Sequence, residues 1–282
     1  MRSALHHHNS KWLPYKYDIN VYRGCSHRCV YCYALYTHEY IGGSDFYGEV
    51  FAKKNIAEAL KRELVGHGRE MVNLGGVCDS YQHAERELKL MPPVLALLAQ
   101  YRVPTVVCTK STLILRDIDL LKRVDEAGVL GAALTITTMD ERVASLIEPG
   151  APGPRQRMNT VAQLNANGIR CGVHMMPIIP YLTSDKSSME AVFSAAKDAG
   201  ADYVLAGAVN LKGHTRRSFF DSVHQSFPVE AKKIRGLYTD RQAYSAYKER
   251  LAKELKQLRV RYDMPVYRDL DVPSDTEQLS FL

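Results

Sequence analysis

The chain has 282 residues, of which 46% are hydrophobic and 24% charged, a composition that suits one large folded domain and excludes wholesale disorder. No stretch approaches the roughly 18 uninterrupted apolar residues that a membrane span needs, and residues 1–16 lack the apolar run of a secretory signal, so we expect a cytoplasmic protein. The net charge of +6 is compatible with a polyanionic partner such as DNA but does not by itself indicate one.

Short β-branched or apolar runs alternate with longer amphipathic runs through the middle of the chain. Strand–helix alternation of this regularity predicts a parallel sheet with right-handed crossovers. Six units fit either an open doubly wound sheet or a partial barrel, and in both folds ligands bind at the carboxyl ends of the strands. In chain order, the pattern predicts strands at 18–22, 71–75, 105–108, 132–137, 170–176 and 203–206, and helices at 56–64, 85–101, 117–127, 155–167 and 186–199.

The pattern loosens after Gly207. A basic segment at 211–217 leads into Phe219 and Phe220, and a charged amphipathic helix is expected at 241–259. The end of the chain is polar and contains proline, which predicts a flexible tail. We therefore expect four regions: an N-terminal extension (1–14), the strand–helix unit (15–210), a C-terminal substrate-side region (211–268) and the tail (269–282).

Three of the six cysteines, Cys25, Cys29 and Cys32, lie together directly after the first predicted strand. A reducing cytosol disfavours disulfides, so clustered cysteines indicate a metal centre or catalysis. A structural zinc site usually takes four protein ligands, and only His27 or His38 lies near enough in sequence to complete such a set. Iron–sulfur clusters are normally held by four thiolates, so a cluster held by three keeps one iron open to a substrate.

The Cys-x3-Cys-x2-Cys spacing, with Tyr31 directly before the last cysteine, resembles the signature of the radical S-adenosylmethionine (SAM) superfamily. The resemblance implies that the three cysteines hold a 4Fe–4S cluster whose open iron binds SAM. It also implies that an electron from a flavodoxin- or ferredoxin-type donor cleaves SAM to methionine and a 5′-deoxyadenosyl radical, which abstracts a hydrogen atom from the substrate.

Between residues 15 and 206 the sequence is similar to the spore photoproduct lyase branch of that superfamily. The similarity implies a partial (β/α)6 barrel of the radical SAM type, with a C-terminal helical extension in which little of the family pattern can be matched. The matching residues are Tyr31 and Tyr33 around the third cysteine, Thr109-Lys110 after the third predicted strand, Thr135 in the fourth, the turn Glu148-Pro149-Gly150, and Arg157.

The same resemblance implies a SAM site at the carboxyl ends of the strands. Gly75 and Gly76 would let the SAM amino group approach the backbone closely. Asp79 would accept a hydrogen bond from the SAM ammonium or ribose, with an ordinary turn residue as the alternative. Lys110 would pair with the SAM carboxylate, because a lysine buried at a strand end is costly without an anion.

Two further residues belong to this implied site. Thr135 would donate its hydroxyl to SAM, and an ordinary β-branched strand residue is the alternative. Arg157 would also contact the cofactor, unless it is only a surface charge on its predicted helix.

In spore photoproduct lyase a cysteine near the end of the second strand returns a hydrogen atom to the product radical. A glycine of this chain aligns with that cysteine, and Cys78 follows two residues later. The resemblance therefore makes Cys78 a candidate catalytic hydrogen-atom relay, together with Tyr31 and Tyr33; a small buried thiol is the alternative. Cys108 and Cys171 fall within predicted strands, and we expect them in the core.

Two segments bear on DNA as the substrate. The basic segment with Phe219 and Phe220 suits an unstacked or flipped nucleotide, unless the two rings are core residues. The terminal residues Gln278–Leu282 are similar, with their last two residues swapped, to the peptides by which bacterial repair proteins bind the sliding clamp; a tail folded onto its own barrel is the alternative. We expect a DNA photoproduct lyase-like repair enzyme. The alternatives are a radical SAM enzyme that modifies a peptide or small metabolite, and a non-enzymatic iron–sulfur or zinc binding module.

Overall fold

The computed structural model describes residues 3–9, 13 and 15–266. Its strands are β1 (Leu5–His7), β2 (Tyr17–Ile19), β3 (Tyr22–Arg23), β4 (Phe51–Ala52), β5 (Val72–Leu74), β6 (Thr105–Thr109), β7 (Leu130–Thr135), β8 (Cys171–Ile178) and β9 (Val204–Ala208). Its helices are α1 (Ile56–Leu64), α2 (Glu85–Leu88), α3 (Met91–Gln100), α4 (Ile118–Ala127), α5 (Glu141–Ile147), α6 (Pro154–Ala166), α7 (Lys186–Asp198), α8 (Gly213–Ser226), α9 (Pro228–Thr239) and α10 (Arg241–Tyr262), with 3-10 helices η1 (Tyr33–Ile41) and η2 (Thr112–Asp117).

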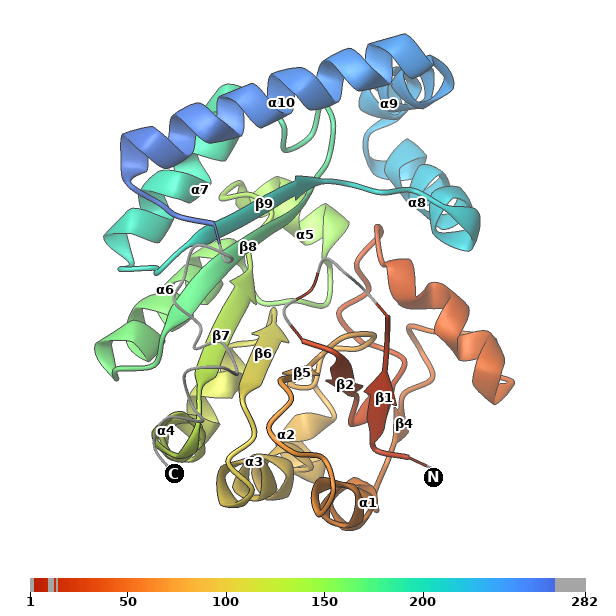
Figure 1. Cartoon of the computed structure of the whole chain (residues 1–282). Helices are drawn as coiled ribbons and strands as arrows, with labels where there is room; N and C mark the ends of the chain where they lie inside the picture. Colours follow the sequence, from red (N-terminus) through yellow and green to blue (C-terminus); the bar gives the residue numbers. More distant parts are fainter. Residues whose placement is uncertain (1–2, 10–12, 14, 267–282) are drawn as a thin grey trace.

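The main sheet has the strand order β1-β2-β5-β6-β7-β8-β9, in which β1 is antiparallel to β2 and all later neighbours are parallel. The six parallel strands are neighbours in chain order, so the sheet winds in one direction. A doubly wound sheet would reverse its strand order at a switch point. Because β1 and β9 do not pair within the described part of the chain, the sheet is an open, partial (β/α)6 barrel, as expected (Figure 1).

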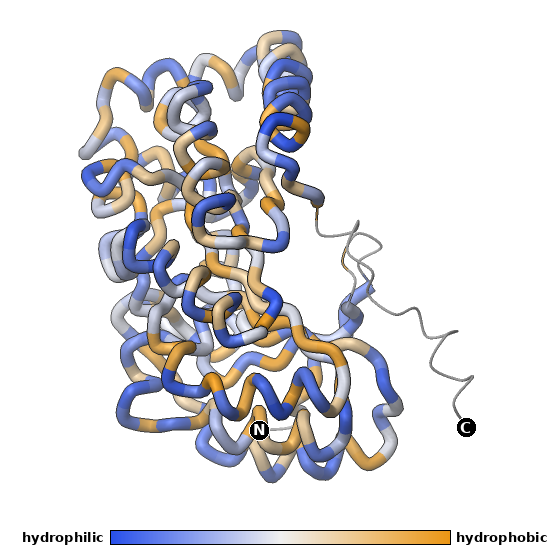
Figure 2. The backbone as a smooth tube through the Cα atoms, turned by 90° about the vertical axis from the view of Figure 1, so that its left-hand side faces the viewer, coloured by the Kyte–Doolittle hydropathy of each residue, from blue (hydrophilic) through white to orange (hydrophobic). Residues whose placement is uncertain are grey.

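The helices α1, α3, α4, α6 and α7 cover the outer side of the sheet (Figure 1). Figure 2 shows hydrophobic and hydrophilic residues mixed along the backbone, and α1 buries Ile56, Leu60 and Leu64 while α4 buries Leu121 and Val124, which gives each of these two helices an apolar stripe. Helix α7, for example, begins at Asp185, whose carboxylate accepts a hydrogen bond from the Ser188 N–H. It buries Val192 and Phe193 in the main core.

Two sequence expectations about helices were wrong. The single helix expected at 85–101 is interrupted, because Lys89 adopts a left-handed backbone with a φ of 46° and ends α2. The basic segment after Gly207 is not loose: from Gly213 it is the first turn of α8, which buries Phe219, Phe220 and Val223 at helical spacing. Helices α5 and α9 were not expected.

The C-terminal helices pack at two places on the barrel. Helix α10 runs over α7 and contacts β9, and α8 lies beside η1 near the carboxyl ends of the strands (Figure 1). None of the helices in the described residues is long and apolar enough to cross a membrane. The segment Gln278–Leu282, for which clamp binding was predicted, lies outside the described residues.

Candidate functional site

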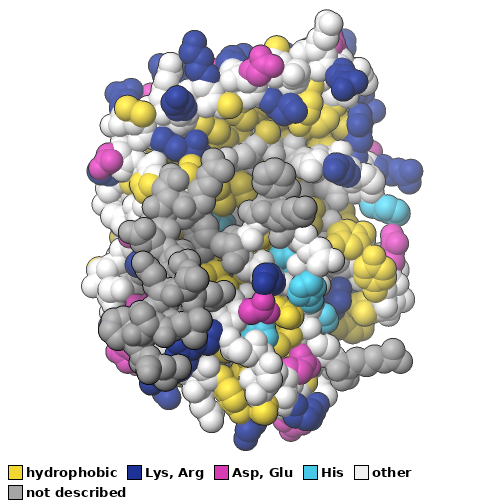
Figure 3. All heavy atoms as spheres, in the orientation of Figure 1, with side chains coloured by type: hydrophobic (Ala, Val, Ile, Leu, Met, Phe, Trp, Pro, Cys, Tyr) yellow, Lys and Arg dark blue, Asp and Glu magenta, His cyan; other side chains and the backbone are white. Residues whose placement is uncertain are grey.

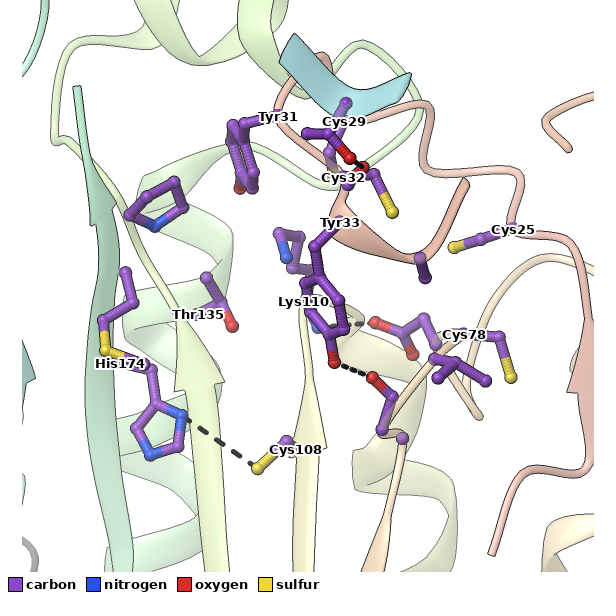
Figure 4. A pocket seen from close by; sticks show the side chains of 18 of the residues that line it. Cys25, Cys29, Tyr31, Cys32, Tyr33, Cys78, Cys108, Lys110, Thr135 and His174 are labelled. Carbon is purple, nitrogen blue, oxygen red and sulfur yellow. Dashed lines mark hydrogen bonds between the residues drawn. The ribbon is translucent and has the colours of Figure 1, made fainter. Parts of the chain in front are cut away.

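A cavity of about 830 Å³ opens at the carboxyl ends of the parallel strands, within the size range of small-molecule and cofactor sites. It is bordered by the loop after β3, by the ends of β5 to β9 and by the first turn of α8 (Figure 4). Eleven of the twelve predicted site residues line it: Cys25, Cys29, Tyr31, Cys32, Tyr33, Gly75, Gly76, Cys78, Asp79, Lys110 and Thr135. Arg157 is the exception.

The loop that carries the three clustered cysteines is fixed by contacts from three other parts of the chain. The Cys25 N–H donates to the Phe46 carbonyl at 3.0 Å, and the Val30 N–H donates to the Ile147 carbonyl at 2.9 Å. The Tyr47 hydroxyl donates to the Cys29 carbonyl at 2.7 Å. From the C-terminal region, the Thr215 hydroxyl donates to the Cys32 carbonyl at 3.0 Å. The three sulfur atoms are therefore held in a preformed arrangement.

The three thiols share one cavity and an environment that keeps them protonated when no metal is bound. Burial raises the pKa of Cys29 to about 12, against an opposing effect of Lys110. Burial also raises the pKa of Cys25 and of Cys32, although the backbone N–H groups of Asp79 and His27 beside the Cys25 sulfur act in the opposite direction. Figure 4 shows the side chains of Cys25 and Cys32 extending into the same region of the site. A metal centre would supply the positive charge that thiolates need there.

The zinc alternative finds no set of ligands in this site. Within residues 3–9, 13 and 15–266, no three His, Cys, Asp or Glu side chains converge on the position of a single metal ion. The Nδ1 atom of His27 lies 3.2 Å from the Asp79 carboxylate, and the Nε2 atom of His38 lies 3.1 Å from the Glu49 carboxylate. Three thiols that share a cavity without meeting at one point fit a cluster of several atoms better than one ion.

Asp79 joins the cysteine loop to the ends of β5 and β6. One carboxylate oxygen accepts hydrogen bonds from the Thr109 hydroxyl at 2.7 Å and the Tyr81 N–H at 2.8 Å, and the other accepts from the Lys110 N–H at 2.7 Å and faces His27. Burial raises the pKa of Asp79, but His27 and these hydrogen bonds outweigh it and hold the pKa well below its usual range. These four partners occupy the carboxylate, so Asp79 holds the cysteine loop against the ends of β5 and β6. Its predicted contact with SAM stays a prediction.

Arg157 is not a surface charge: it is 1% exposed, on α6. Its guanidinium donates to the Glu148 carboxylate at 2.6 Å and to the Thr135 carbonyl at 2.7 Å. Glu148 also accepts a hydrogen bond from the Tyr31 hydroxyl and, at 3.2 Å, from the Thr137 hydroxyl. Arg157 therefore acts on the cavity through Glu148 and Thr135, which couple the cysteine loop to β7.

Lys110 places a cation in the cavity wall at the end of β6. Burial lowers the pKa of its ammonium, but the nearby Cys29, Glu148 and Asp79 raise it more, so the net shift is upward and the side chain stays charged. The ammonium lies 5.6 Å from the centroid of the Tyr31 ring. Within the described residues, no carboxylate forms an ion pair with it. Thr135 lies near Lys110 on the same wall (Figure 4).

The two glycines after β5 allow the backbone to pass close to its neighbours. Gly75 has a φ of 101°, and a Cβ atom there would collide with the Cys108 carbonyl. A Cβ atom at Gly76 would collide with the Asp18 carboxylate. The Gly76 carbonyl accepts a hydrogen bond from the Tyr33 hydroxyl, so the cysteine loop reaches across the cavity to this turn. Gly75 is therefore required by the backbone geometry, whether or not SAM contacts it, whereas a side chain at Gly76 would need only the Asp18 side chain to move.

The cysteines outside the loop differ in their placement. The Cys78 thiol is buried and donates to the Tyr22 carbonyl at 3.1 Å. Cys171 is a core residue, as expected. The expectation that Cys108 lies in the core was wrong: it lines the cavity, and its sulfur lies 4.0 Å from the Nδ1 atom of His174 (Figure 4). Burial raises the pKa of Cys108 to about 12, and burial with Lys110 lowers that of His174 to about 4, so both groups are neutral near pH 7.

The two phenylalanines of the basic segment do not offer a stacking surface. Phe219 is fully buried and Phe220 is 5% exposed, which confirms the alternative that they are core residues. The basic segment, which the sequence analysis associated with nucleotide binding, reaches the cavity through Lys212, His214 and Thr215, but its helical structure was missed. The signal was present, because hydrophobic residues recur at helical spacing in this segment.

The Radical SAM superfamily model matches residues 19–192 of this chain. Among curated proteins, an uncharacterized protein of Mycobacterium tuberculosis is 33% identical over 261 residues, which cover 90% of this chain and 76% of the relative. An uncharacterized protein of Methanocaldococcus jannaschii is 30% identical over 213 residues, which cover 76% of this chain and 77% of the relative.

Two solved structures are similar in fold. A mutant spore photoproduct lyase with bound AdoMet and dinucleoside spore photoproduct gives a TM-score of 0.60 at 16% identity, covering 78% of this chain and 63% of that chain. Streptococcus suis SuiB bound to S-adenosylmethionine gives a TM-score of 0.50 at 14% identity, covering 74% of this chain and 48% of that chain. This chain thus spans less than two thirds of the length of either structure.

Proposed function

The chain belongs to the radical SAM superfamily, and from this premise we propose that it is a DNA photoproduct lyase-like repair enzyme that uses a 4Fe–4S cluster and SAM. The observation that carries the proposal is the cavity in which a loop with three cysteine thiols faces the Lys110 ammonium, which forms no ion pair with a carboxylate of the described residues. When bound, the cluster and SAM supply a reductive cleavage of the sulfonium and an organic radical that abstracts a hydrogen atom from the substrate.

The residues of the cavity fit these two groups. Cys25, Cys29 and Cys32 would hold the cluster, and the preformed loop would spare the cost of ordering the ligands. Lys110 would bind the SAM carboxylate, because a charged ammonium in a buried wall is stabilised by an anion. Thr135, one strand further, would donate its hydroxyl to the same ligand.

Two kinds of side chain in the cavity wall are proposed as the hydrogen-atom relay. A relay group breaks its S–H or O–H bond, the product radical gains the hydrogen atom as a C–H bond, and the unpaired electron stays on the protein. An electron from the flavodoxin- or ferredoxin-type donor and a proton then restore the relay group. Cys78, Tyr31 and Tyr33 line the cavity and carry such bonds. Burial keeps the pKa of the Cys78 thiol raised, at about 12, so its S–H bond is intact at neutral pH.

DNA as the substrate is supported by the likeness in fold to a lyase with a bound dinucleoside photoproduct and by the size of the cavity. The test uses anaerobically reconstituted protein with a chemical reductant, and measures methionine released from SAM. We expect a dinucleoside photoproduct, or DNA that contains it, to raise the rate at least severalfold over undamaged DNA. Release of methionine that only peptides or small metabolites accelerate would contradict DNA as the substrate and leave the radical SAM chemistry intact.

A further inference from the structure

The positive charge of the chain is concentrated in its C-terminal helices. Residues 212–262 contain 13 Lys and Arg against 5 Asp and Glu, a net charge of +8, whereas the rest of the chain contains 24 against 26, a net charge of −2. Lys and Arg side chains accordingly gather along the upper part of the face in Figure 3, over the region that Figure 1 labels α9 and α10. The family model ends at residue 192, so this charge lies outside the part of the chain that defines the superfamily.

Six of these cations lie on or next to α8 and α9 and form what we call the basic face: Lys212, Arg216, Arg217, Lys232, Lys233 and Arg235. No carboxylate of a described residue forms an ion pair with any of them. Two arginines of the barrel behave differently, since the partly exposed Arg116 and the buried Arg157 both pair with carboxylates. The basic face therefore keeps its charge available to a partner.

Aromatic rings hold the centre of the basic face in place. The guanidinium groups of Arg216 and Arg235 both lie over the Phe220 ring, at 5.8 and 4.7 Å from its centroid, and Arg216 also lies 5.9 Å from the centroid of Tyr238. Lys233 lies 6.0 Å from the centroid of Tyr181. Two like charges on one ring repel each other, and an anion placed between them removes that repulsion. The rings also lower the entropy that the arginines lose on binding.

The basic face is continuous with the cavity and with the cysteine loop. Lys212, His214 and Thr215 line the cavity from the first turn of α8. The Thr215 hydroxyl also donates to the Cys32 carbonyl. A chain of phosphates along α8 and α9 would therefore pass the mouth of the cavity, where one unit of the polymer can enter.

We propose that the basic face is a docking site for the phosphate backbone of duplex DNA, with the reacting nucleotides turned out of the helix into the cavity. Arginine is suited to phosphate because its planar donors match two oxygens at once. An anionic membrane fits less well, because Phe220 under the two arginines is buried and Val229 is the one large hydrophobic residue of α8 and α9 that is exposed. This inference rests on the proposed function for the identity of the polymer.

The test is fluorescence anisotropy of a labelled duplex of about 20 base pairs with the full-length, cluster-loaded protein, titrated at several salt concentrations. Each lost phosphate contact lowers the slope of log affinity against log salt by about 0.9. The double variant R216Q/R235Q should therefore lower the slope by about 1.8 and weaken binding roughly 60-fold at 0.1 M salt. The matched control is R62Q/R123Q, which removes two exposed arginines of α1 and α4 and should leave binding unchanged.

A second variant tests whether weaker binding by R216Q/R235Q comes only from altered packing around Phe220. R217Q/K232Q removes two exposed cations that lie over no aromatic ring of the described residues, and it should weaken binding in the same direction. Equal weakening by R62Q/R123Q, or unchanged binding in both basic-face variants, would overturn the docking site. Tighter binding to duplex RNA, to anionic phospholipid vesicles or to polyglutamate would also overturn the assignment to DNA. If DNA binds here without accelerating methionine release from SAM, the docking site stands and the proposed function fails.

Discussion

Replacement of Glu148 by alanine should destabilise the protein more than removal of any carboxylate at its surface. Glu148 is fully buried and accepts hydrogen bonds from Arg157, Tyr31 and Thr137. Its removal would leave the Arg157 guanidinium inside the protein with no counter-charge. The Nε atom of that guanidinium already has no hydrogen-bond partner in the structure, so no nearby group is poised to take over.

The magnitude follows from the burial of the pair. Loss of one partner of a buried ion pair costs about 3–5 kcal/mol, because the remaining charge is uncompensated. In a chain of this size about 1 kcal/mol corresponds to roughly 2–3 °C in Tm, so we expect a fall of about 6–15 °C. The double variant E148A/R157M should recover part of this loss, because it removes the stranded charge.

Anaerobic thermal melting of the cluster-loaded protein measures the effect, with iron content as a second readout, since Tyr31 of the cysteine loop loses its hydrogen-bond partner. The matched control is E126A, which removes an exposed carboxylate of α4 and should change stability by less than about 0.5 kcal/mol. A Tm of E148A within about 2 °C of the unchanged protein would refute the view that this pair organises the site.

The Glu148–Arg157 ion pair also predicts how the stability of the folded protein changes with pH. Burial raises the pKa of Glu148, but Arg157, Lys110 and the hydrogen bonds lower it more, so the net pKa lies below its ordinary value. A lowered carboxyl pKa stabilises the folded state above the unfolded pKa, about 4.3, and this contribution is lost as the pH falls below it. The fall in folding stability as the pH is lowered should therefore be smaller in E148Q than in the unchanged protein.

Four other predictions concern the site and the tail. Changing any one of the three loop cysteines to alanine should abolish the cluster, seen as lost iron and a lost electron paramagnetic resonance signal; stoichiometric zinc without reducible iron would contradict the assignment. Lys110→Ala should weaken SAM binding by roughly 10–150-fold while iron content is unchanged, and unchanged affinity would remove Lys110 from the site. Iodoacetamide should label Cys108 before Cys171, and SAM should protect Cys108; equal labelling would show that Cys108 is not accessible. A peptide of the last ten residues, which includes Gln278–Leu282, should bind a bacterial sliding clamp with a Kd on the order of micromolar; absence of binding at hundreds of micromolar would end the clamp proposal.

Much of the fold could be predicted because strand–helix alternation is a local pattern. The helix at 56–64 was predicted with the boundaries that α1 has, and each of the six predicted strands overlaps a strand of the parallel sheet. The choice between a doubly wound sheet and a partial barrel depends on which strands pair. Strand pairing joins residues that are far apart in the sequence. The observed strand order therefore decides between the two folds, whereas the periodicity of the sequence does not.

Arg157 shows why the role of a charged residue is harder to predict than its position. A helical arginine is exposed in most proteins, and its burial here depends on Glu148, which lies nine residues earlier at the end of α5. The sequence contained both residues, and the resemblance singled out both. Their pairing depends on how α5 and α6 are placed on either side of the turn at Glu148, and α5 had not been predicted.

Cys108 shows that one correctly predicted cavity residue, here Lys110, indicates which other residues of its strand face the cavity. Side chains at i and i+2 of a strand point to the same side of a sheet, so Lys110 in the cavity implies that Cys108 and Val106 also face the cavity, and all three line it. The expectation of a core position rested only on the placement of Cys108 within a predicted strand. In an open barrel one face of each strand is turned inward, toward the cavity, and burial there is compatible with contact to a ligand. The same rule extends to β8, where His174 and Met176 share a side and line the cavity. In a fold of this kind, the polar residues two positions before a strand-end ligand are therefore the first place to look for the rest of the site.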